Sequence, residues 1–202
     1  MPRIRAATID EHKELTRTEI LEAAGRLFRA EGYGETTLRD IASYVGIGRT
    51  TLYEYFSDKE DVLVNLVEDT IPGVVDGLLT GLPDSTSCRE RLSELIVRSL
   101  EFVSTDSDLG STLMRELPRL SRTAQRRVRK AHGRLETEMT RLCRLGIETG
   151  EFRPFEPRDA GRLVYQIVMS AGQGLVRDAD AKQHIHDVAD TLVRFVFDGL
   201  AN

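Results

Sequence analysis

The spacing of three small or apolar residues constrains the fold of this 202-residue chain more than any other feature. Ala42 lies four positions before Gly46, and Leu52 follows Gly46 by six. A small residue lets a second helix cross the first closely, and a glycine supplies the positive φ of a tight turn. Leu52 would then anchor the second helix on the first. We therefore expect two short helices, over about 37–44 and 48–55, joined at Gly46.

Helical spacing also predicts the element that precedes this pair. Five apolar residues share one face of a helix over 11–31: Ile20, Leu21, Ala24, Leu27 and Phe28. Gly32 follows this run and suits a left-handed C-cap. The first 57 residues therefore predict a three-helix domain that contains a helix-turn-helix.

Two sequence patterns resemble capping boxes, in which a side chain at a helix start and one three residues later bond each other's backbone N–H groups. Thr37 and Asp40 form the first, at the start of the 37–44 helix. Ser57 and Glu60 form the second and would begin a linking helix over 58–80, which Pro72 disturbs.

The rest of the chain also shows helical periodicity, and alternation typical of strands is absent. We expect five further helices over 88–104, 107–118, 121–149, 157–177 and 182–200. The predicted fold class is all-α, with an N-terminal helix-turn-helix domain over 1–57 and a helical C-terminal domain over 58–202.

Composition excludes several classes of protein. No segment approaches the roughly 20 apolar residues of a membrane span, and the N-terminus has no apolar core of a signal peptide, so we expect a cytoplasmic protein without a membrane partner. Cys88 and Cys143 are too few for a disulfide framework and are interpreted as reduced thiols. The pair His184 and His186 is spaced unfavourably for a metal site on a helix, so we expect neither metal nor cofactor.

The net charge of −5 disfavours indiscriminate binding to nucleic acid. Residues 1–70 hold 9 basic and 14 acidic side chains, which accounts for the whole deficit. Any affinity of this region for DNA must therefore come from locally placed basic groups.

The predicted second helix of the pair has a polar outer face. With Leu52 directed inward, Arg49, Thr50 and Tyr53 must point outward near its start. This is the segment that a helix-turn-helix inserts into the major groove of DNA.

A longer pattern resembles the DNA-binding domain of the TetR (tetracycline-repressor) family. The run T-x-R-D-I-A-x-x-x-G-x-x-x-x-T-L-Y-x-Y-F-x-x-K-E-D, preceded by ILEAAGRLFRAEGY, is similar to that domain over about residues 14–65. The stretch LGIETGEFRP (145–154) resembles the link before the family's dimerisation helices. The resemblance implies a double-stranded DNA operator as partner.

The resemblance also implies roles for individual residues. The base-edge readers would be Arg39, Arg49 and Thr50, because an arginine can donate two hydrogen bonds to guanine. The contacts to the DNA backbone would be Thr37, Thr51, Tyr53, Tyr55 and Lys59. Arg3 and Arg5 would form an arm toward the minor groove. Two positions depart from the family pattern: Gly48 replaces a capping residue, and Glu54 places a negative charge near the phosphates.

The last two predicted helices are apolar around most of their circumference, so each needs partners on two sides. One side can face the protein's own core and the other a second copy, which predicts a homodimer with a four-helix interface. The expected interface residues are Leu163, Ile167, Leu192, Phe195 and Val196.

The C-terminal domain offers candidates for a ligand cavity, although the same residues would also fit an ordinary core: Phe102, Met114, Met139, Cys143, Gln166 and Ile167. The effector would be an apolar or amphipathic small molecule. The basic stretch 115–134 fits a solvated helix face, an entrance for an anionic ligand such as an acyl-CoA, or incidental attraction to DNA.

Together these features predict a ligand-responsive transcriptional regulator, a repressor that binds a near-palindromic operator as a dimer and is released by a small molecule. No GxSxG, HExxH or catalytic Cys/His pattern is present, so we do not expect an enzyme. The alternative is a small-molecule-binding protein with weak or vestigial DNA binding, which the acidic N-terminal third would suit.

Overall fold

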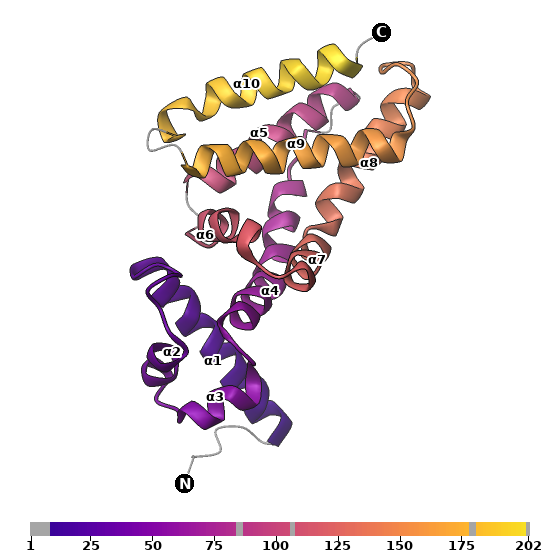
Figure 1. The fold of residues 1–202 in the computed structure, drawn as a ribbon. Coiled ribbons are helices and arrows are strands. Elements are labelled where there is room, and N and C mark those ends of the chain that lie inside the picture. The colour runs from indigo at the N-terminus through magenta and orange to yellow at the C-terminus, as the bar shows by residue number, and fades with distance from the viewer. Residues whose placement is uncertain (1–8, 84–86, 106–107, 178–180, 201–202) are drawn as a thin grey trace. The chain divides into compact units, whose positions relative to one another are not determined.

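A computed structural model describes residues 9–83, 87–105, 108–177 and 181–200. Over these residues the protein has ten α-helices, a short 3-10 helix and no strand (Figure 1), which confirms the all-α prediction. The chain forms two compact units. The N-terminal unit comprises 1–69 and 120–128, and the C-terminal unit comprises 70–119 and 129–202. The N-terminal unit therefore includes the first half of the linking helix and a short later segment, neither of which lies within the expected domain 1–57.

The N-terminal unit is built from α1 (Ile9–Ala30), α2 (Leu38–Val45), α3 (Arg49–Tyr55), the start of α4 (Lys59–Leu79) and most of α7 (Arg122–Ala131). Its core contains the apolar face of α1 that the sequence predicts, together with the anchors of α2, α3 and α4. The fully or almost fully buried side chains of this core include Ile20, Ala24, Ile41, Leu52, Phe56 and Leu63.

The turn between α2 and α3 follows the sequence prediction. Gly46 has φ 78° in the left-handed region, where a side chain would be strained. At the start of α2, Thr37 and Asp40 form the expected capping box: the Asp40 N–H donates to Thr37 Oγ1 and the Thr37 N–H donates to Asp40 Oδ2. Both ends of α2 are thus fixed by local sequence.

The start of α4 differs from the prediction by one residue. Asp58, and not Ser57, accepts the hydrogen bond of the N–H three residues later, with a distance of 2.7 Å from Asp61 N to Asp58 Oδ1. Asp61 in turn accepts from the Ser57 N–H at 3.2 Å. Glu60 makes no reciprocal bond here because its carboxylate accepts both the N–H and the hydroxyl of Ser121 in the later segment.

The C-terminal unit contains α5 (Cys88–Thr105), α6 (Asp108–Glu116), η1 (Leu117–Arg119), α8 (Gly133–Glu148), α9 (Pro157–Arg177) and α10 (Ala181–Leu200), with the second half of α4. Helix α9 packs against α8, α5 and α10, and α10 also packs against α5 (Figure 1). Helices α8 and α9 cross closely at Gly161, where an added Cβ would lie 2.4 Å from the Thr140 backbone. Glycine is therefore required at this crossing.

The expected single helix over 121–149 was wrong, because the structure has α7 and α8 in its place. His132 separates them with φ −84° and ψ 1°, and Gly133 follows. Residues 120–128 belong to the N-terminal unit, whereas α8 belongs to the C-terminal unit. The two parts of this segment pack in different units, so the chain breaks at a point where the helical periodicity of the sequence is continuous.

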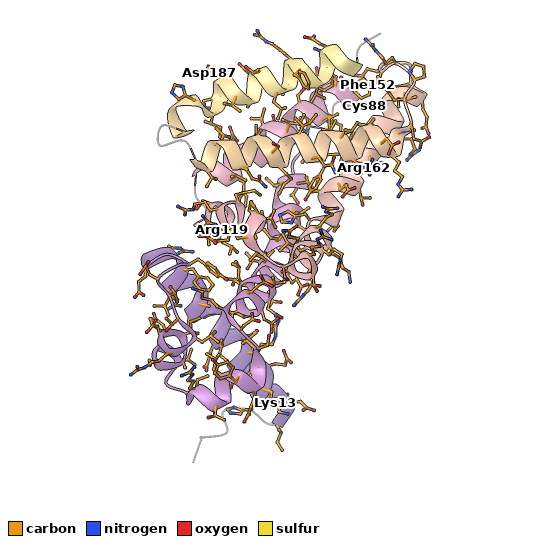
Figure 2. All side chains as sticks on the ribbon, viewed as in Figure 1. Lys13, Cys88, Arg119, Phe152, Arg162 and Asp187 are labelled. Carbon is orange, nitrogen blue, oxygen red and sulfur yellow. The ribbon has the colours of Figure 1, made fainter. Side chains whose placement is uncertain are left out.

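A carboxylate stabilises the start of α5. Glu151 accepts hydrogen bonds from the Ser87 hydroxyl at 2.7 Å and from the backbone N–H groups of Cys88 and Arg89, both at 2.9 Å. The neighbouring Phe152 packs against Phe197 with a centroid distance of 5.8 Å. Figure 2 shows Cys88 and Phe152 at this end of the C-terminal unit. The loop after α8 thereby helps to close the helical core.

Both cysteines are buried and free. Burial raises the pKa of the Cys143 thiol to about 11, so this side chain behaves as a small apolar group. Among the described residues, no helix combines the length and the hydropathy needed to cross a membrane.

Candidate nucleic-acid interface

The outer face of α3 is the most distinctive polar surface of the N-terminal unit. Arg49 and Thr50 are exposed, and Tyr53 is 44% exposed. On the opposite face, Leu52 is fully buried and Phe56 is 1% exposed. Leu52 and Phe56 therefore anchor the short helix on the core of the unit, while its polar side chains remain accessible to solvent.

Arg49 and Tyr53 form a pair on this face. Arg49 Nη2 donates to Tyr53 Oη at 3.2 Å, and its guanidinium carbon lies 5.5 Å from the centroid of the tyrosine ring. One helical turn separates the two residues, the spacing at which helical side chains meet. Tyr53 thus orients the guanidinium and leaves its other N–H groups available as donors.

The start of α3 has no side-chain cap, because its N-cap residue is Gly48. Glu54 is exposed and is the only acidic residue in α3. Both features agree with the departures from the family pattern noted in the sequence.

Two predicted DNA contacts lie at the start of α2. Arg39 is exposed, and so is Thr37. The Thr37 hydroxyl donates to Asp40 Oδ2 at 2.6 Å, so its proton is used within the capping box. The hydrogen bonds from the Thr37 side chain and N–H lower the pKa of Asp40, which keeps the cap ionised.

The other predicted backbone contacts differ in their surroundings. Thr51 and Tyr55 are half-buried on α3. Lys59 is also half-buried, and its ammonium group donates to the carbonyl oxygens of Tyr33, Gly34 and Thr36. Arg3 and Arg5 lie outside the described residues.

Tyr44, near the end of α2, was missed by the sequence analysis. Its side chain is 55% exposed, and its interaction with Arg26 of α1 raises the pKa of that guanidinium. It is an exposed aromatic residue two positions before the turn glycine Gly46.

Three acidic residues of the N-terminal third, Asp61, Glu68 and Asp69, pair with arginines of the same unit. Arg127 of α7 donates to both carboxylate oxygens of Glu68, at 3.0 and 2.6 Å, and to Asp61 at 3.0 Å. Arg17 of α1 donates to Asp69 at 2.7 Å and to Asn65 at 2.9 Å. These pairs lie on α4 and neutralise charge that the sequence alone would count against DNA binding.

The basic stretch 115–134 therefore has a structural role in part, which none of its three interpretations anticipated. The signal was present in the sequence as acidic and amide side chains at positions 61, 65, 68 and 69, which fall on one face of a helix.

The C-terminal unit contains a narrow apolar cavity. Side chains of α4, α5, α6, α8 and α9 line it, and most are aliphatic, aromatic or methionine. Its polar side chains are Ser99, whose hydroxyl donates to the Leu95 carbonyl at 2.6 Å, and the buried His132. The lining suits an apolar molecule or the apolar part of an amphipathic one.

The structure separates the six residues suggested for a ligand cavity. Phe102 and Met114 line the cavity. Met139 and Cys143 are fully buried but do not belong to its lining in the described part of the chain, because they pack within the helical core. The other two do not line it either: Gln166 is exposed, and Ile167 faces a groove on the surface.

That groove lies between α9 and α10 and is strongly apolar. Leu163 is 52% exposed in it and Phe195 is 67% exposed, and Phe155 beside them is 43% exposed. Ile167 and Val196 also line the groove, so its lining contains four of the five expected interface residues. Leu192 is 7% exposed and does not line the groove, because it turns into the unit's own core.

His184 and His186 are both exposed on α10. Across the described segments of the chain, no group of three or more His, Cys, Asp or Glu side chains is arranged to hold a metal ion.

Comparisons with known proteins agree with this architecture. Residues 20–66 match the sequence profile of bacterial regulatory proteins of the tetR family, and residues 85–200 match that of the tetracyclin repressor-like C-terminal domain. The HTH-type transcriptional repressor KstR2 of Mycobacterium tuberculosis is 31% identical over 157 residues, which cover 75% of each chain.

Two solved structures show the same fold. The transcriptional regulator FadR of Bacillus subtilis, in complex with stearoyl-CoA, superposes with a TM-score of 0.70 at 19% identity, covering 87% of this chain and 97% of FadR. A regulator from Saccharomonospora viridis in complex with choline has a TM-score of 0.72 at 20% identity, covering 94% of this chain and 99% of the other. Because the chain matches both domain profiles and has the fold of the two solved structures, the protein belongs to the TetR family of transcriptional regulators.

Proposed function

We propose that this protein is a ligand-responsive repressor that binds a near-palindromic operator as a homodimer. The observation that carries the proposal is the outer face of α3, where Arg49 is oriented by Tyr53 on a helix anchored by Leu52. A helix of this kind inserts its first residues into the major groove, where arginine reads guanine. Arg39 and Thr50 would add base contacts, and Thr37, Thr51 and Tyr55 would contact the backbone.

The groove between α9 and α10 supports the dimer. Leu163 and Phe195 are large apolar side chains that a single copy leaves exposed in it. A second copy related by two-fold symmetry would cover the same patch on both chains. The resulting four-helix interface would hold two copies of α3 for two half-sites of one operator.

The apolar cavity supports regulation by a small molecule. Because the cavity is narrow, an effector would displace the flexible Met114 and Met169 side chains of its lining. Stearoyl-CoA and choline, the ligands of the two structural neighbours, differ in chemistry, and the apolar lining here favours an effector with a substantial apolar part. A difference of a few kcal/mol in affinity between two conformations is sufficient to release an operator.

The decisive experiment is fluorescence anisotropy of the purified protein with DNA from upstream of its own gene, with a random duplex as control. Specific binding should exceed the control by about a thousandfold or more and weaken as salt rises. Fragments selected by the protein from genomic DNA would supply the operator if it lies elsewhere.

Failure of both the upstream DNA and the selected fragments would contradict the proposal. A protein that bound a metabolite but no DNA would then be a small-molecule-binding protein, the alternative function. The relatives that the chain matches are transcriptional regulators, so we propose neither an enzymatic activity nor a cofactor. Because such a regulator acts on DNA, we place the protein in the cytoplasm.

A further inference from the structure

Lys59 occupies a site that its sequence motif does not reveal. It is the first residue of α4, and its ammonium nitrogen lies 2.6 Å from the carbonyl oxygen of Tyr33. The same nitrogen lies 3.1 Å from the Gly34 carbonyl and 2.8 Å from the Thr36 carbonyl. All three acceptors belong to the turn between α1 and α2.

These contacts use the full hydrogen-bonding capacity of the side chain. A lysine ammonium has three N–H donors and no acceptor, and three backbone carbonyls receive them here. The ammonium also lies 4.4 Å from the centroid of the Tyr33 ring, within the range of a cation–π interaction. A phosphate could gain a hydrogen bond from Lys59 only if one of the carbonyls lost its own.

The turn that Lys59 binds leads directly into the helix-turn-helix. Thr36 is fully buried, and its N–H and hydroxyl both donate to the Gly32 carbonyl, at 3.2 and 2.9 Å. Thr37, the next residue, caps α2. Lys59 itself follows α3 after only three residues, the first of which is the buried Phe56. One side chain therefore joins the segment that enters the helix-turn-helix to the segment that leaves it.

We propose that Lys59 is a positioning residue, whose ammonium closes the helix-turn-helix by binding the 33–36 turn and does not contact a DNA phosphate. This replaces the role that the family resemblance implied. The binding of Lys59 to the 33–36 turn does not depend on the proposed function. Only the expected effect on DNA affinity rests on that function.

Limited acetylation of the DNA-free protein, followed by peptide mass spectrometry, tests the geometry directly. Lys13 and Lys130 are exposed and serve as references in the same sample, and Figure 2 labels Lys13 on α1. We expect Lys59 to react about tenfold more slowly than either, because its amine must first leave three carbonyls. Reaction of Lys59 at the rate of Lys13 would overturn the proposal.

Two substitutions test the positioning effect without DNA. Lys59→Met removes the donors but keeps an unbranched chain, and Lys59→Arg keeps the charge but replaces the three-donor ammonium with a planar fork. Both variants should increase hydrogen exchange over residues 33–40 by about tenfold, whereas the Lys13→Met control should not change it. Unchanged exchange in both Lys59 variants would also refute the proposal.

DNA binding then separates the two roles. A phosphate contact predicts that Lys59→Arg keeps wild-type affinity and that Lys59→Met reduces the slope of log K against log salt by about 0.9 per contact. Positioning predicts that both variants lose operator affinity with an unchanged slope, at a temperature where circular dichroism shows them folded. If the wild-type protein binds no DNA, the proposed function fails, while acetylation and exchange still decide the role of Lys59.

Discussion

At the scale of single residues, the orientation of Arg49 is set by one neighbour. The hydrogen bond and ring contact with Tyr53 restrict the guanidinium before any DNA arrives. Restricting a side chain in its bound orientation lowers the entropy lost on binding. The helical spacing of the two residues is visible in the sequence, but which rotamers they adopt is not.

Arg49→Ala should cost about 1–3 kcal/mol of operator binding and relax sequence preference at one base pair. The physical reason is the loss of paired hydrogen bonds to a guanine edge. Anisotropy titrations of operators substituted one base pair at a time would locate the affected position. Equal losses on operator and random DNA would show that Arg49 contacts only the backbone.

A second residue-scale prediction concerns pH. Burial alone would raise the pKa of Glu151, but the hydrogen bonds from Ser87 and the N–H groups of Arg89 and Cys88 outweigh it and lower the pKa. A carboxylate whose pKa is lower in the folded state stabilises the fold above its unfolded pKa, and this contribution is lost as pH falls through the folded value.

The Glu151→Gln variant should therefore be less stable than wild type by about 1 kcal/mol at pH 7, the usual cost of a lost N-cap. The difference should shrink as the pH falls below the unfolded pKa of a glutamate, about 4.3, and through the lower pKa of the folded state, where the wild-type carboxyl becomes protonated. Thermal unfolding of both proteins from pH 7 to pH 3 measures it. A difference that stayed constant with pH would contradict an ionised cap.

At the scale of elements, the segment 120–128 contributes to the N-terminal unit although it is distant in sequence. Ala124 and Val128 are buried, Ser121 binds Glu60, and Arg127 bridges two acidic residues of α4. The hydrogen bonds that Arg127 donates to Glu68 raise the pKa of the guanidinium, which stays charged at every accessible pH. The partners of these α4 residues therefore lie 59 to 66 positions later in the sequence.

Arg127→Met should lower the free energy of unfolding by about 1–3 kcal/mol, because it leaves Asp61 and Glu68 as neighbouring like charges without their shared cation. Arg122→Met is the matched control, since Arg122 is exposed on the same helix. Chemical denaturation followed by circular dichroism compares them. Equal stability of the two variants would mean that the bridge contributes nothing measurable.

The groove between α9 and α10 makes a separate prediction about assembly. Phe195→Glu places a charge in the expected interface and should convert a dimer to a monomer at micromolar concentration. His186→Glu is the control, because this exposed residue lies half a turn away around α10. Sedimentation velocity distinguishes the species. A wild-type monomer, or a Phe195→Glu dimer, would exclude this surface as the interface.

At the scale of the whole molecule, effector binding should depend on the space beside α9. Gly172 is buried in the cavity lining, where an added Cβ would contact Val103 at 3.5 Å, whereas Gly174 is exposed with nothing within 4 Å. Gly172→Leu should fill the cavity and weaken binding of a fluorescent fatty-acyl probe by at least about tenfold. Gly174→Leu should not. Equal effects of the two variants would place the probe outside the cavity.

Local sequence determined much of this protein. The capping box at Thr37, the turn at Gly46 and the buried anchor Leu52 follow from short-range chemistry, so the sequence predicted the helix-turn-helix, its outward face and the all-α class. These features depend on residues close together in the sequence, between Thr37 and Leu52, and the resemblance of residues 14–65 to the TetR family reinforced them.

Only the tertiary structure decided the partners of side chains far apart in the sequence. The contacts of Lys59 with three carbonyls and the bridge from Arg127 to α4 join segments that periodicity treats separately. The division of 121–149 into two helices, in contrast, interrupts a segment that periodicity treats as one. The same holds for the cavity, where Met114 lines the space but Met139 fills the core. Periodicity shows that a side chain points inward, but the neighbours it meets there depend on how the helices cross, and no single helix carries that information.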